Sequence, residues 1–336
     1  MKKNKTFIIA EVGVNHNGNI DTAKKLIIVA KKAGCDFVKF QSYKSENLVQ
    51  SKTNIIGYQK KNLKRNLKQI DMLRKYQLTA SDHSVLIDFC KKKKIKFLSS
   101  PFDTESLKLL FKLKVLDIKI ASGEITHYAL LNEVAKKAKR VFLSSGMSNL
   151  KDIKNALSIL TKYNLKKKDL YVLHCHSDYP TEFKDVNLNA MKSIKKNLQV
   201  NIGYSDHTLG FETAISSIVM GAKVIEKHIT LSKKMRGPDH PASMEPKEFY
   251  EFVKSIRNTE KLLGNNIKKP TKKELGIRKI IRKSIVAKFK INKGEKFSES
   301  NIISKRPEGG ISSLYWNRVI GKKAKINFKR DDFIKL

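Results

Sequence analysis

The chain has 336 residues, of which 40% are hydrophobic, so it can bury a large core and is not a disordered protein. It contains no run near the roughly 18 apolar residues that a membrane-spanning helix requires, and its three cysteines lie too far apart for a disulfide framework or a zinc ribbon. The formal net charge of +39 could attract nucleic acid. The lysines are, however, spread along the whole chain, and the densest run, Lys91–Lys94, has no interleaved aromatic residues for base stacking, so we expect neither a nucleic-acid nor a membrane partner.

The amino-terminal segment predicts a cytoplasmic protein. Residues Met1–Lys5 lead into the short apolar run Phe7–Ala10, which is followed directly by Glu11. This run is too short for a signal peptide and lacks a small-residue cleavage site. Reduced, buried thiols at the cysteines fit the same compartment.

Short β-rich runs alternate with segments of helical periodicity through most of the chain. The predicted strands are Phe7–Gly13, Phe37–Ser42, Lys96–Pro101, Asp117–Ser122, Val141–Gly146, Leu170–Cys175, Val200–Asp206 and Lys223–Ile229. Predicted helices such as Ile20–Ala33 and Leu150–Leu160 lie between most of them. The connection Tyr43–Ile95 is too long for one helix and predicts an irregular, partly helical excursion.

This alternation predicts an α/β protein with a TIM barrel at residues 1–262. A doubly wound open sheet is the alternative, but no Gly-x-Gly-x-x-Gly follows the first strand. Residues 263–275 turn polar, with Gly264 and Pro270 as breakers, and predict a linker. Residues 276–336 read as short strands and turns, which predicts a small β-rich domain that packs against another surface.

Polar side chains stand near the end of every predicted barrel strand, where TIM barrels carry their active sites. Lys39 and Lys119 lie on strands, and four other strand ends or following turns carry serine. Two lysines with several hydroxyl groups favour a pocket for phosphate or carboxylate. A Schiff-base aldolase or lyase would also place a lysine on a barrel strand, and this alternative stays open.

Two pairs of histidines are candidates for binding a divalent metal. His207 and His228 end adjacent predicted strands, so their imidazoles can share one cation and leave positions open for water and substrate. His174 and His176, two residues apart on one strand, are a rival pair of similar weight.

A series of motifs in order along the chain resembles the bacterial sialic acid synthases. The motifs are EVGVNHNG (11–18), FVKFQ (37–41), SSPFD (99–103), KIASGE (119–124), SSGM (144–147), YSDHTLG (204–210), EKHITL (226–231), MRGPDHPASMEP (235–246) and SKRPEGGIS (304–312). The resemblance covers essentially the whole chain. It implies a TIM barrel followed by a small antifreeze-like (SAF) domain, and condensation of phosphoenolpyruvate with an N-acetylated mannosamine-type sugar.

The resemblance also implies roles for individual residues. Glu11 matches the catalytic carboxylate, and His207 and His228 match the ligands of a divalent metal, Mn²⁺ or Mg²⁺. Positions that hold phosphoenolpyruvate in the family correspond to Lys39, Ser100, Lys119, Ser122, Ser144 and Ser205. Positions that face the sugar correspond to Gln41, Glu124, Tyr179, Asp239 and Arg306. Arg306 would reach the site from a partner subunit, because family members form domain-swapped homodimers.

The identity of the sugar is the least defined expectation. Ser177, His127 and the sequence Glu308–Gly310 depart from the usual family pattern near the sugar site. The loop sequence around Asp239 occurs both in N-acetylneuraminate synthases and in N,N'-diacetyllegionaminate synthases, and it argues against pseudaminic acid synthases. We expect N-acetylmannosamine as the substrate and N-acetylneuraminate as the product, with the legionaminate reaction on 2,4-diacetamido-2,4,6-trideoxymannose as the alternative.

Overall fold

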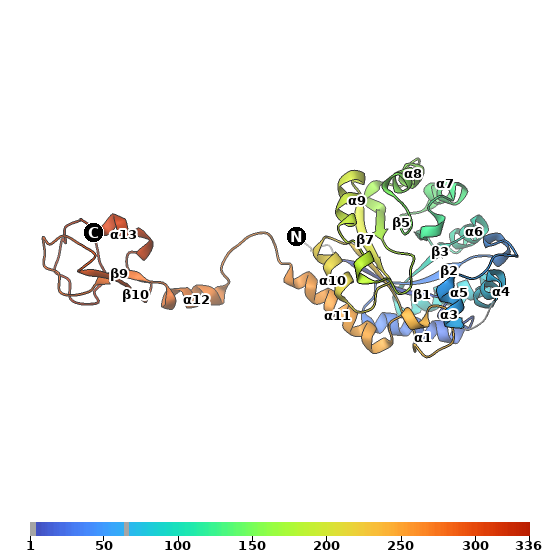
Figure 1. The fold of residues 1–336 in the computed structure, drawn as a ribbon, viewed down its shortest axis with the longest axis horizontal. Helices are drawn as coiled ribbons and strands as arrows, with labels where there is room; N and C mark the ends of the chain where they lie inside the picture. Colours follow the sequence, from blue (N-terminus) through green and yellow to red (C-terminus); the bar gives the residue numbers. More distant parts are fainter. Residues whose placement is uncertain (1–4, 64–66) are drawn as a thin grey trace. The chain divides into compact units, whose positions relative to one another are not determined.

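The computed structural model describes residues 5–63 and 67–336, which form two compact units, Met1–Gly264 and Asn265–Leu336. The first unit is a closed parallel barrel surrounded by helices (Figure 1). Its strands are β1 (Phe7–Gly13), β2 (Phe37–Ser42), β3 (Lys96–Pro101), β4 (Asp117–Ile120), β5 (Arg140–Ser144), β6 (Leu170–His174), β7 (Asn201–Asp206) and β8 (Val224–His228). The TIM barrel that the sequence predicts is therefore confirmed, with strand ends that differ from prediction by two residues at most.

One helix covers each interval of the barrel. These helices are α1 (Ile20–Ala33), α5 (Ala80–Lys93), α6 (Thr104–Lys112), α7 (Tyr128–Lys137), α8 (Leu150–Leu160), α9 (Ala190–Leu198), α10 (Glu212–Val219) and α11 (Pro246–Leu262). The excursion between β2 and β3 adds the short helices α2 (Ser45–Leu48), α3 (Gly57–Leu63) and α4 (Gln69–Tyr76) before α5. No helix in the described part of the chain is long and apolar enough to cross a membrane.

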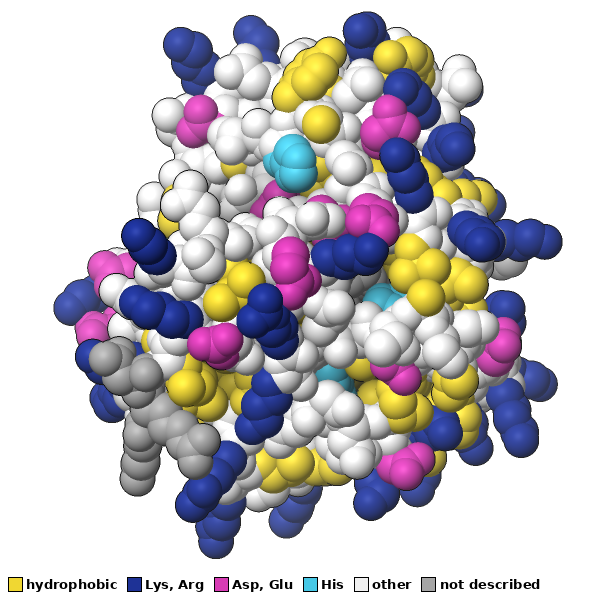
Figure 2. Space-filling model, turned by 90° about the vertical axis from the view of Figure 1, so that its right-hand side faces the viewer, with side chains coloured by type: hydrophobic (Ala, Val, Ile, Leu, Met, Phe, Trp, Pro, Cys, Tyr) yellow, Lys and Arg dark blue, Asp and Glu magenta, His cyan; other side chains and the backbone are white. Residues whose placement is uncertain are grey.

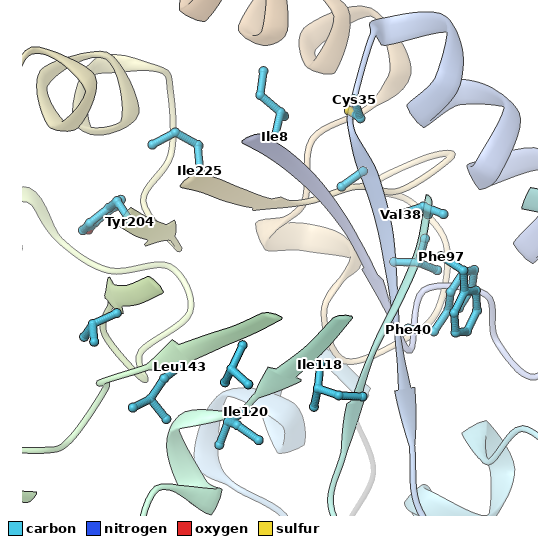
Figure 3. Close-up of a cluster of buried hydrophobic side chains, with 14 of the residues drawn as sticks. Ile8, Cys35, Val38, Phe40, Phe97, Ile118, Ile120, Leu143, Tyr204 and Ile225 are labelled. Carbon is cyan, nitrogen blue, oxygen red and sulfur yellow. The ribbon is translucent and has the colours of Figure 1, made fainter. Parts of the chain in front are cut away.

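Alternation of side chains along each strand divides the core into two layers. On β1, Ile8 and Ala10 face the helices, whereas Ile9 and Glu11 face the barrel axis. The outer layer contains the outward side chains of all the strands and the apolar faces of the helices, and Figure 3 shows part of it. The amino-terminal half of the barrel interior is filled by apolar side chains: Ile9, Phe37, Leu98, Phe142, Leu173 and Val224, with Phe7 and Tyr171 packed against them.

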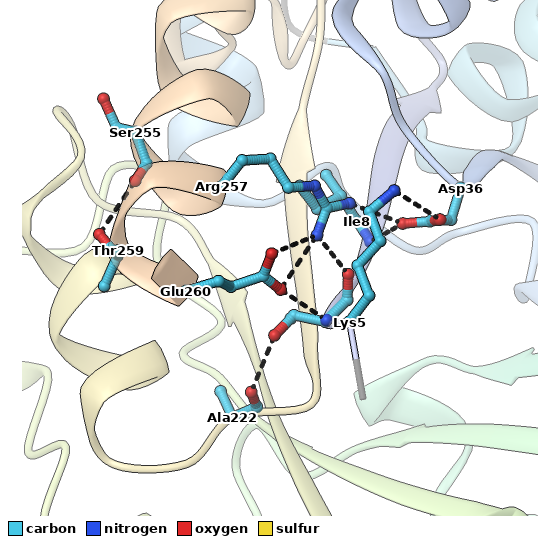
Figure 4. Close-up of polar contacts among 9 residues, drawn as sticks. Lys5, Ile8, Asp36, Ala222, Ser255, Arg257, Thr259 and Glu260 are labelled. Carbon is cyan, nitrogen blue, oxygen red and sulfur yellow. Dashed lines mark hydrogen bonds and ion pairs between the residues drawn. The ribbon is translucent and has the colours of Figure 1, made fainter. Parts of the chain in front are cut away.

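The first strand is joined to the last helix of the barrel by a network of polar contacts (Figure 4). Arg257 on α11 donates from Nη1 to the carbonyl of Thr6 at 2.8 Å and from Nη2 to Asp36 Oδ2 at 3.0 Å. The same Asp36 oxygen accepts the backbone N–H of Ile8 at 2.9 Å, and Glu260 accepts the N–H of Thr6 at 2.6 Å. The network holds the start of β1 to α11 and to the turn before β2.

The second unit contains helix α12 (Lys272–Ile281), the antiparallel pair β9 (Ser284–Ala287) and β10 (Ile302–Lys305), and the short helix α13 (Trp316–Val319). Its own small core consists of Ile285, Ala287, Ile291, Phe297, Ile302, Val319, Ala324, Phe328 and Ile334. Arg278 on α12 makes a two-armed contact with Glu308, with nitrogen–oxygen distances of 3.0 to 3.3 Å. This contact ties α12 to the loop that carries the exposed side chain of Arg306.

The basic residues on the face drawn in Figure 2 do not form a single patch. Figure 2 shows one face of the molecule, on which Lys and Arg side chains are spread between hydrophobic and uncharged ones. This distribution is consistent with a lysine-rich composition more than with a dedicated polyanion site.

We predict that Arg257→Ala lowers the free energy of unfolding by about 1–3 kcal/mol, because it leaves partly buried partners of the guanidinium without their donor. Lys254→Ala on the same helix is the matched control, since the Lys254 side chain is 56% exposed and pairs only at the surface with Glu251. Chemical denaturation followed by circular dichroism measures both. Equal effects of the two substitutions would contradict a stabilising role for the network.

Candidate active site

A cavity of about 370 Å³ opens at the carboxyl ends of the barrel strands. Every barrel residue that the sequence singles out for a role in the site lines it. These residues are Glu11, Lys39, Gln41, Ser100, Lys119, Ser122, Glu124, Ser144, Tyr179, Ser205, His207, His228 and Asp239. They reach the cavity because each occupies an inward-facing position on its strand or lies in the loop that follows it.

Four buried charged groups form the floor of the cavity. Lys39 Nζ lies 3.3 Å from Glu11 Oε2 and 3.2 Å from Glu226 Oε1, and Lys119 Nζ lies 3.5 Å from the same Glu226 oxygen. Ser205 donates a hydrogen bond of 2.9 Å to Glu226. Because each of these four ionisable side chains is at most 5% exposed, the ionic groups are almost completely removed from water.

The two carboxyl groups differ in their protonation. Burial raises the pKa of Glu11 above its ordinary value, and the nearby charge of Lys39 offsets this only in part. Burial also opposes ionisation of Glu226, but the charges of Lys119 and Lys39 outweigh it and hold the pKa of Glu226 below its ordinary value. Two carboxyl groups whose pKa values are driven apart in one site can act as a proton donor and as a fixed negative charge.

Glu226 is the residue of the floor that the sequence-based site omits. It stands two positions before His228 on β8, and the strand period of two therefore directs both side chains into the barrel. That period was the available signal, and the buried contacts with Lys39 and Lys119 are what identify Glu226 as part of the site.

His207 and His228 lie side by side at the wall of the cavity, with ring centroids 5.5 Å apart. Burial lowers the pKa of His207 to about 3 and also lowers that of His228, so both imidazoles are neutral. His207 Nδ1 donates to the carbonyl of His176 at 2.5 Å, which leaves its Nε2 with a free lone pair. Two neutral imidazoles of this kind can bind a metal cation.

The rival pair of histidines does not line the cavity. His174 faces away from the barrel axis, and its Nε2 donates to the carbonyl of Val186 at 2.9 Å. The intervening Cys175 faces inward and lines the cavity instead, where the N–H of Gly146 donates to its sulfur at 3.1 Å. Strand alternation therefore excludes His174 from the site.

Aromatic rings continue from the histidines toward the excursion. Tyr179 lies over His207 with centroids 4.0 Å apart, and Tyr58 from α3 stacks on Tyr179 at 5.1 Å with an interplanar angle of 27°. Burial raises the pKa of the neighbouring Asp239 to about 6. Asn62 on α3 donates to the carbonyl of Pro238 at 2.6 Å, which joins the excursion to the loop that carries Asp239.

The opposite side of the cavity carries the residues that depart from the usual family pattern. His127 Nδ1 lies 2.8 Å from Glu124 Oε2, and Ser177 Oγ lies 3.5 Å from Ser122 Oγ. Gly146, at a φ of 42°, closes this wall, because a Cβ atom there would lie 2.3 Å from Ser122 Cβ. Arg306, the remaining predicted site residue, belongs to the carboxyl-terminal unit.

The arrangement supports binding of a small, multiply charged anion beside a proton donor. Lys39 and Lys119 supply positive charge, and the serine hydroxyls supply directed hydrogen bonds. Glu11, whose pKa is raised by burial, can give a proton, and the two neutral histidines can offer nitrogens to a cation.

Comparison with known proteins agrees with this chemistry. The model of the NeuB family matches residues 26–268, and that of the SAF domain matches residues 282–336. The chain is 46% identical over 331 residues to an N,N'-diacetyllegionaminic acid synthase of Campylobacter jejuni, covering 98% of this chain and 99% of the relative. It is 40% identical to the enzyme of the same name from Legionella pneumophila, covering 96% and 91%.

A solved structure extends the likeness to three dimensions. The N-acetylneuraminic acid synthetase of Leptospira borgpetersenii superposes with a TM-score of 0.71 at 32% identity, over 81% of this chain and 90% of that chain. The small β-rich domain that the sequence predicts is thus confirmed as a SAF domain, and the chain belongs to the NeuB family of sialic acid-type synthases.

Proposed function

We propose that this enzyme is an N,N'-diacetyllegionaminate synthase, which condenses phosphoenolpyruvate with 2,4-diacetamido-2,4,6-trideoxymannose and water. The sequence alone favours N-acetylneuraminate as the product. The comparisons favour the alternative, because identity is 46% and 40% to two legionaminate synthases but 32% to the neuraminate synthetase. The observation that carries the reaction class is the buried floor, in which two lysines meet one protonated and one ionised carboxyl group.

Phosphoenolpyruvate would occupy the floor of the cavity. Its phosphate and carboxylate would contact Lys39 and Lys119, with hydrogen bonds from the serine hydroxyls. The serines at hydrogen-bonding positions are Ser100, Ser122, Ser144 and Ser205. Glu226 would hold both lysines in place, since it contacts each of them.

The bond changes then follow from the chemistry of the two substrates. The C3 carbon of phosphoenolpyruvate attacks the aldehyde carbon of the open-chain sugar, and a C–C bond forms as the aldehyde oxygen takes up a proton. Water adds to C2 and loses one proton, and phosphate then leaves with the second proton of that water as the bond from C2 to the phosphate oxygen breaks and the C2 ketone forms. Glu11 is placed to give the proton to the aldehyde oxygen and to recover one from the water, because burial favours its protonated form.

A divalent cation, Mn²⁺ or Mg²⁺, fits the donors at the wall of the cavity. His207 and His228 would hold it, since His207 Nε2 is unprotonated and His228 Nδ1 is buried without a hydrogen-bond partner. Within residues 5–63 and 67–336 no group of three or more His, Cys, Asp or Glu side chains is placed to hold a metal, so the two histidines would leave coordination positions open. When bound, such an ion supplies Lewis-acid polarisation of the sugar carbonyl.

A second copy of the chain would complete the sugar site in a domain-swapped homodimer. Segments that follow the barrel strands expose apolar side chains around the mouth of the cavity, among them Tyr128, Met147, Phe183 and Leu209. Exposed apolar patches of this kind mark interaction surfaces. The carboxyl-terminal unit of the partner would cover them and bring Arg306 to the acetamido group of the sugar.

We predict phosphate release from phosphoenolpyruvate with Mn²⁺ and 2,4-diacetamido-2,4,6-trideoxymannose, and at least tenfold slower release with N-acetylmannosamine, because a site built for one substrate discriminates against its analogues. EDTA should abolish the release in both cases. Faster release with N-acetylmannosamine would instead identify a neuraminate synthase. Absence of phosphate release, with a covalent adduct of pyruvate trapped by borohydride, would identify the Schiff-base aldolase.

We predict that Glu11→Gln lowers kcat by about 10²-fold or more with little change in the KM for phosphoenolpyruvate, because it removes the proton donor. Lys119→Ala should mainly raise that KM, because it removes charge from the anion pocket. Steady-state kinetics on folded protein separate the two effects, and Glu133→Gln on the exposed face of α7 is the control. Near-normal turnover by Glu11→Gln would exclude Glu11 as the proton donor.

We predict that the swapped dimer shows complementation between two inactive variants. After subunit exchange, Glu11→Gln mixed with Arg306→Ala should recover about a quarter of wild-type activity, because half of the dimers are mixed and one of their two sites then has both residues. An unswapped dimer or a monomer would recover nothing. Arg330→Ala in the same unit is the matched control for Arg306→Ala, and it should be active without mixing.

A further inference from the structure

Beside the polar side chains of Tyr58, Gln59 and Gln69, an apolar group lines the side of the cavity toward the excursion between β2 and β3, in contrast to the charged floor. It is formed by Leu48, Val49, Ile56, Met72, Leu73 and Phe102, which we call the outer apolar wall. Five of these residues come from the excursion, and Phe102 follows β3. None of the floor residues belongs to this wall, so the cavity has two chemically distinct ends.

The outer apolar wall is a packed structure. Met72 and Leu73 on α4 are buried in a small core that also contains Tyr43 and Tyr76, and Leu48, Val49 and Phe102 pack against it. The hydroxyl of Tyr43 donates to the carbonyl of Leu73 at 3.1 Å. Gln77 accepts from both the N–H and the hydroxyl of Ser45, at 2.8 and 2.7 Å, and so fixes the start of α2. The positions of the wall side chains are therefore determined by the fold.

The composition of the excursion makes its apolar wall informative. The described part of this segment is rich in lysine, but all of its side chains that line the cavity are uncharged. Ile56, which lines the cavity, is 54% exposed. In a chain with 30% charged residues, an uncharged lining at this position points to a ligand with an apolar surface.

The polarity of the cavity orients the acceptor sugar, provided that the proposed function holds. The aldehyde carbon must meet phosphoenolpyruvate at the charged floor, so the far end of the sugar extends toward the mouth. We propose that the outer apolar wall selects a sugar whose far end is deoxygenated at C6, and that Val49 and Ile56 are specificity-determining residues for this methyl group. Both are partly exposed at the mouth, unlike the buried Met72 and Leu73.

The expected selectivity is moderate. A 6-hydroxyl group in contact with Val49 and Ile56 would lose hydrogen bonds to water and gain none from these two side chains, whereas a methyl group loses nothing. Apolar pockets discriminate between such closely related substrates by about 10- to 200-fold. We therefore expect at least a tenfold preference for a 6-deoxy sugar over its 6-hydroxy counterpart.

The test uses two sugars that differ by one oxygen atom, N-acetylmannosamine and 2-acetamido-2,6-dideoxymannose. Phosphate release from phosphoenolpyruvate gives kcat/KM for each, and the ratio of the two values measures selection at C6. The variants are Val49→Thr, which replaces a methyl by a hydroxyl at nearly constant volume, and Ile56→Thr. Val219→Thr is the matched control, because Val219 is exposed at the end of α10, outside the cavity.

We predict a ratio of at least ten in favour of the deoxy sugar for the wild type and for Val219→Thr, and a fall of about five- to tenfold in one or both wall variants. A wild-type ratio near one would overturn the proposal while leaving the synthase activity established. An unchanged ratio in both wall variants would show that selection at C6 resides elsewhere. Silence with these sugars and with the diacetamido sugar would reject the proposed function itself, and the inference with it.

Discussion

The buried charges at the floor of the barrel are the constraint on which the rest of this structure depends. Removing ionised groups from water costs several kcal/mol for each group unless they are paired. Lys39 and Lys119 therefore share Glu226, and Glu11 avoids the cost by favouring its protonated form. The apolar side chains that fill the amino-terminal half of the barrel interior exclude water from this layer. Because water does not screen them, the charges interact strongly enough to bind a multiply charged substrate.

The excursion between β2 and β3 completes a site that the barrel strands only begin. The strands supply charge, hydroxyl groups and imidazoles, but the side chains that would meet the body of a sugar come mostly from loops. Tyr58 on α3 covers Tyr179, and the contact of Asn62 with Pro238 links α3 to the loop that carries Asp239. Reaction chemistry and substrate choice are thus carried by different elements of one chain, as is common in TIM barrels.

Much of the fold could be predicted because its signals are local. Apolar runs marked each barrel strand, and helices such as Ile20–Ala33 and Leu150–Leu160 were correct to the residue. Strand alternation placed Lys39 and Gln41 on one face, where both line the cavity. The same rule, applied to β6, would have removed His174 from the metal candidates, and applied to β8 it would have added Glu226.

The sequence by itself determined the barrel, the SAF domain, the family and the residues available for chemistry, because the periods of helices and strands and the ordered motifs are written along the chain. Only the tertiary structure decided which carboxyl group is protonated, since the pKa values depend on burial and on charges contributed by other strands. The tertiary structure also decided which apolar side chains come together in the outer apolar wall. The residues between 43 and 79 that line the cavity share no sequence pattern. They meet only when the excursion folds over the barrel.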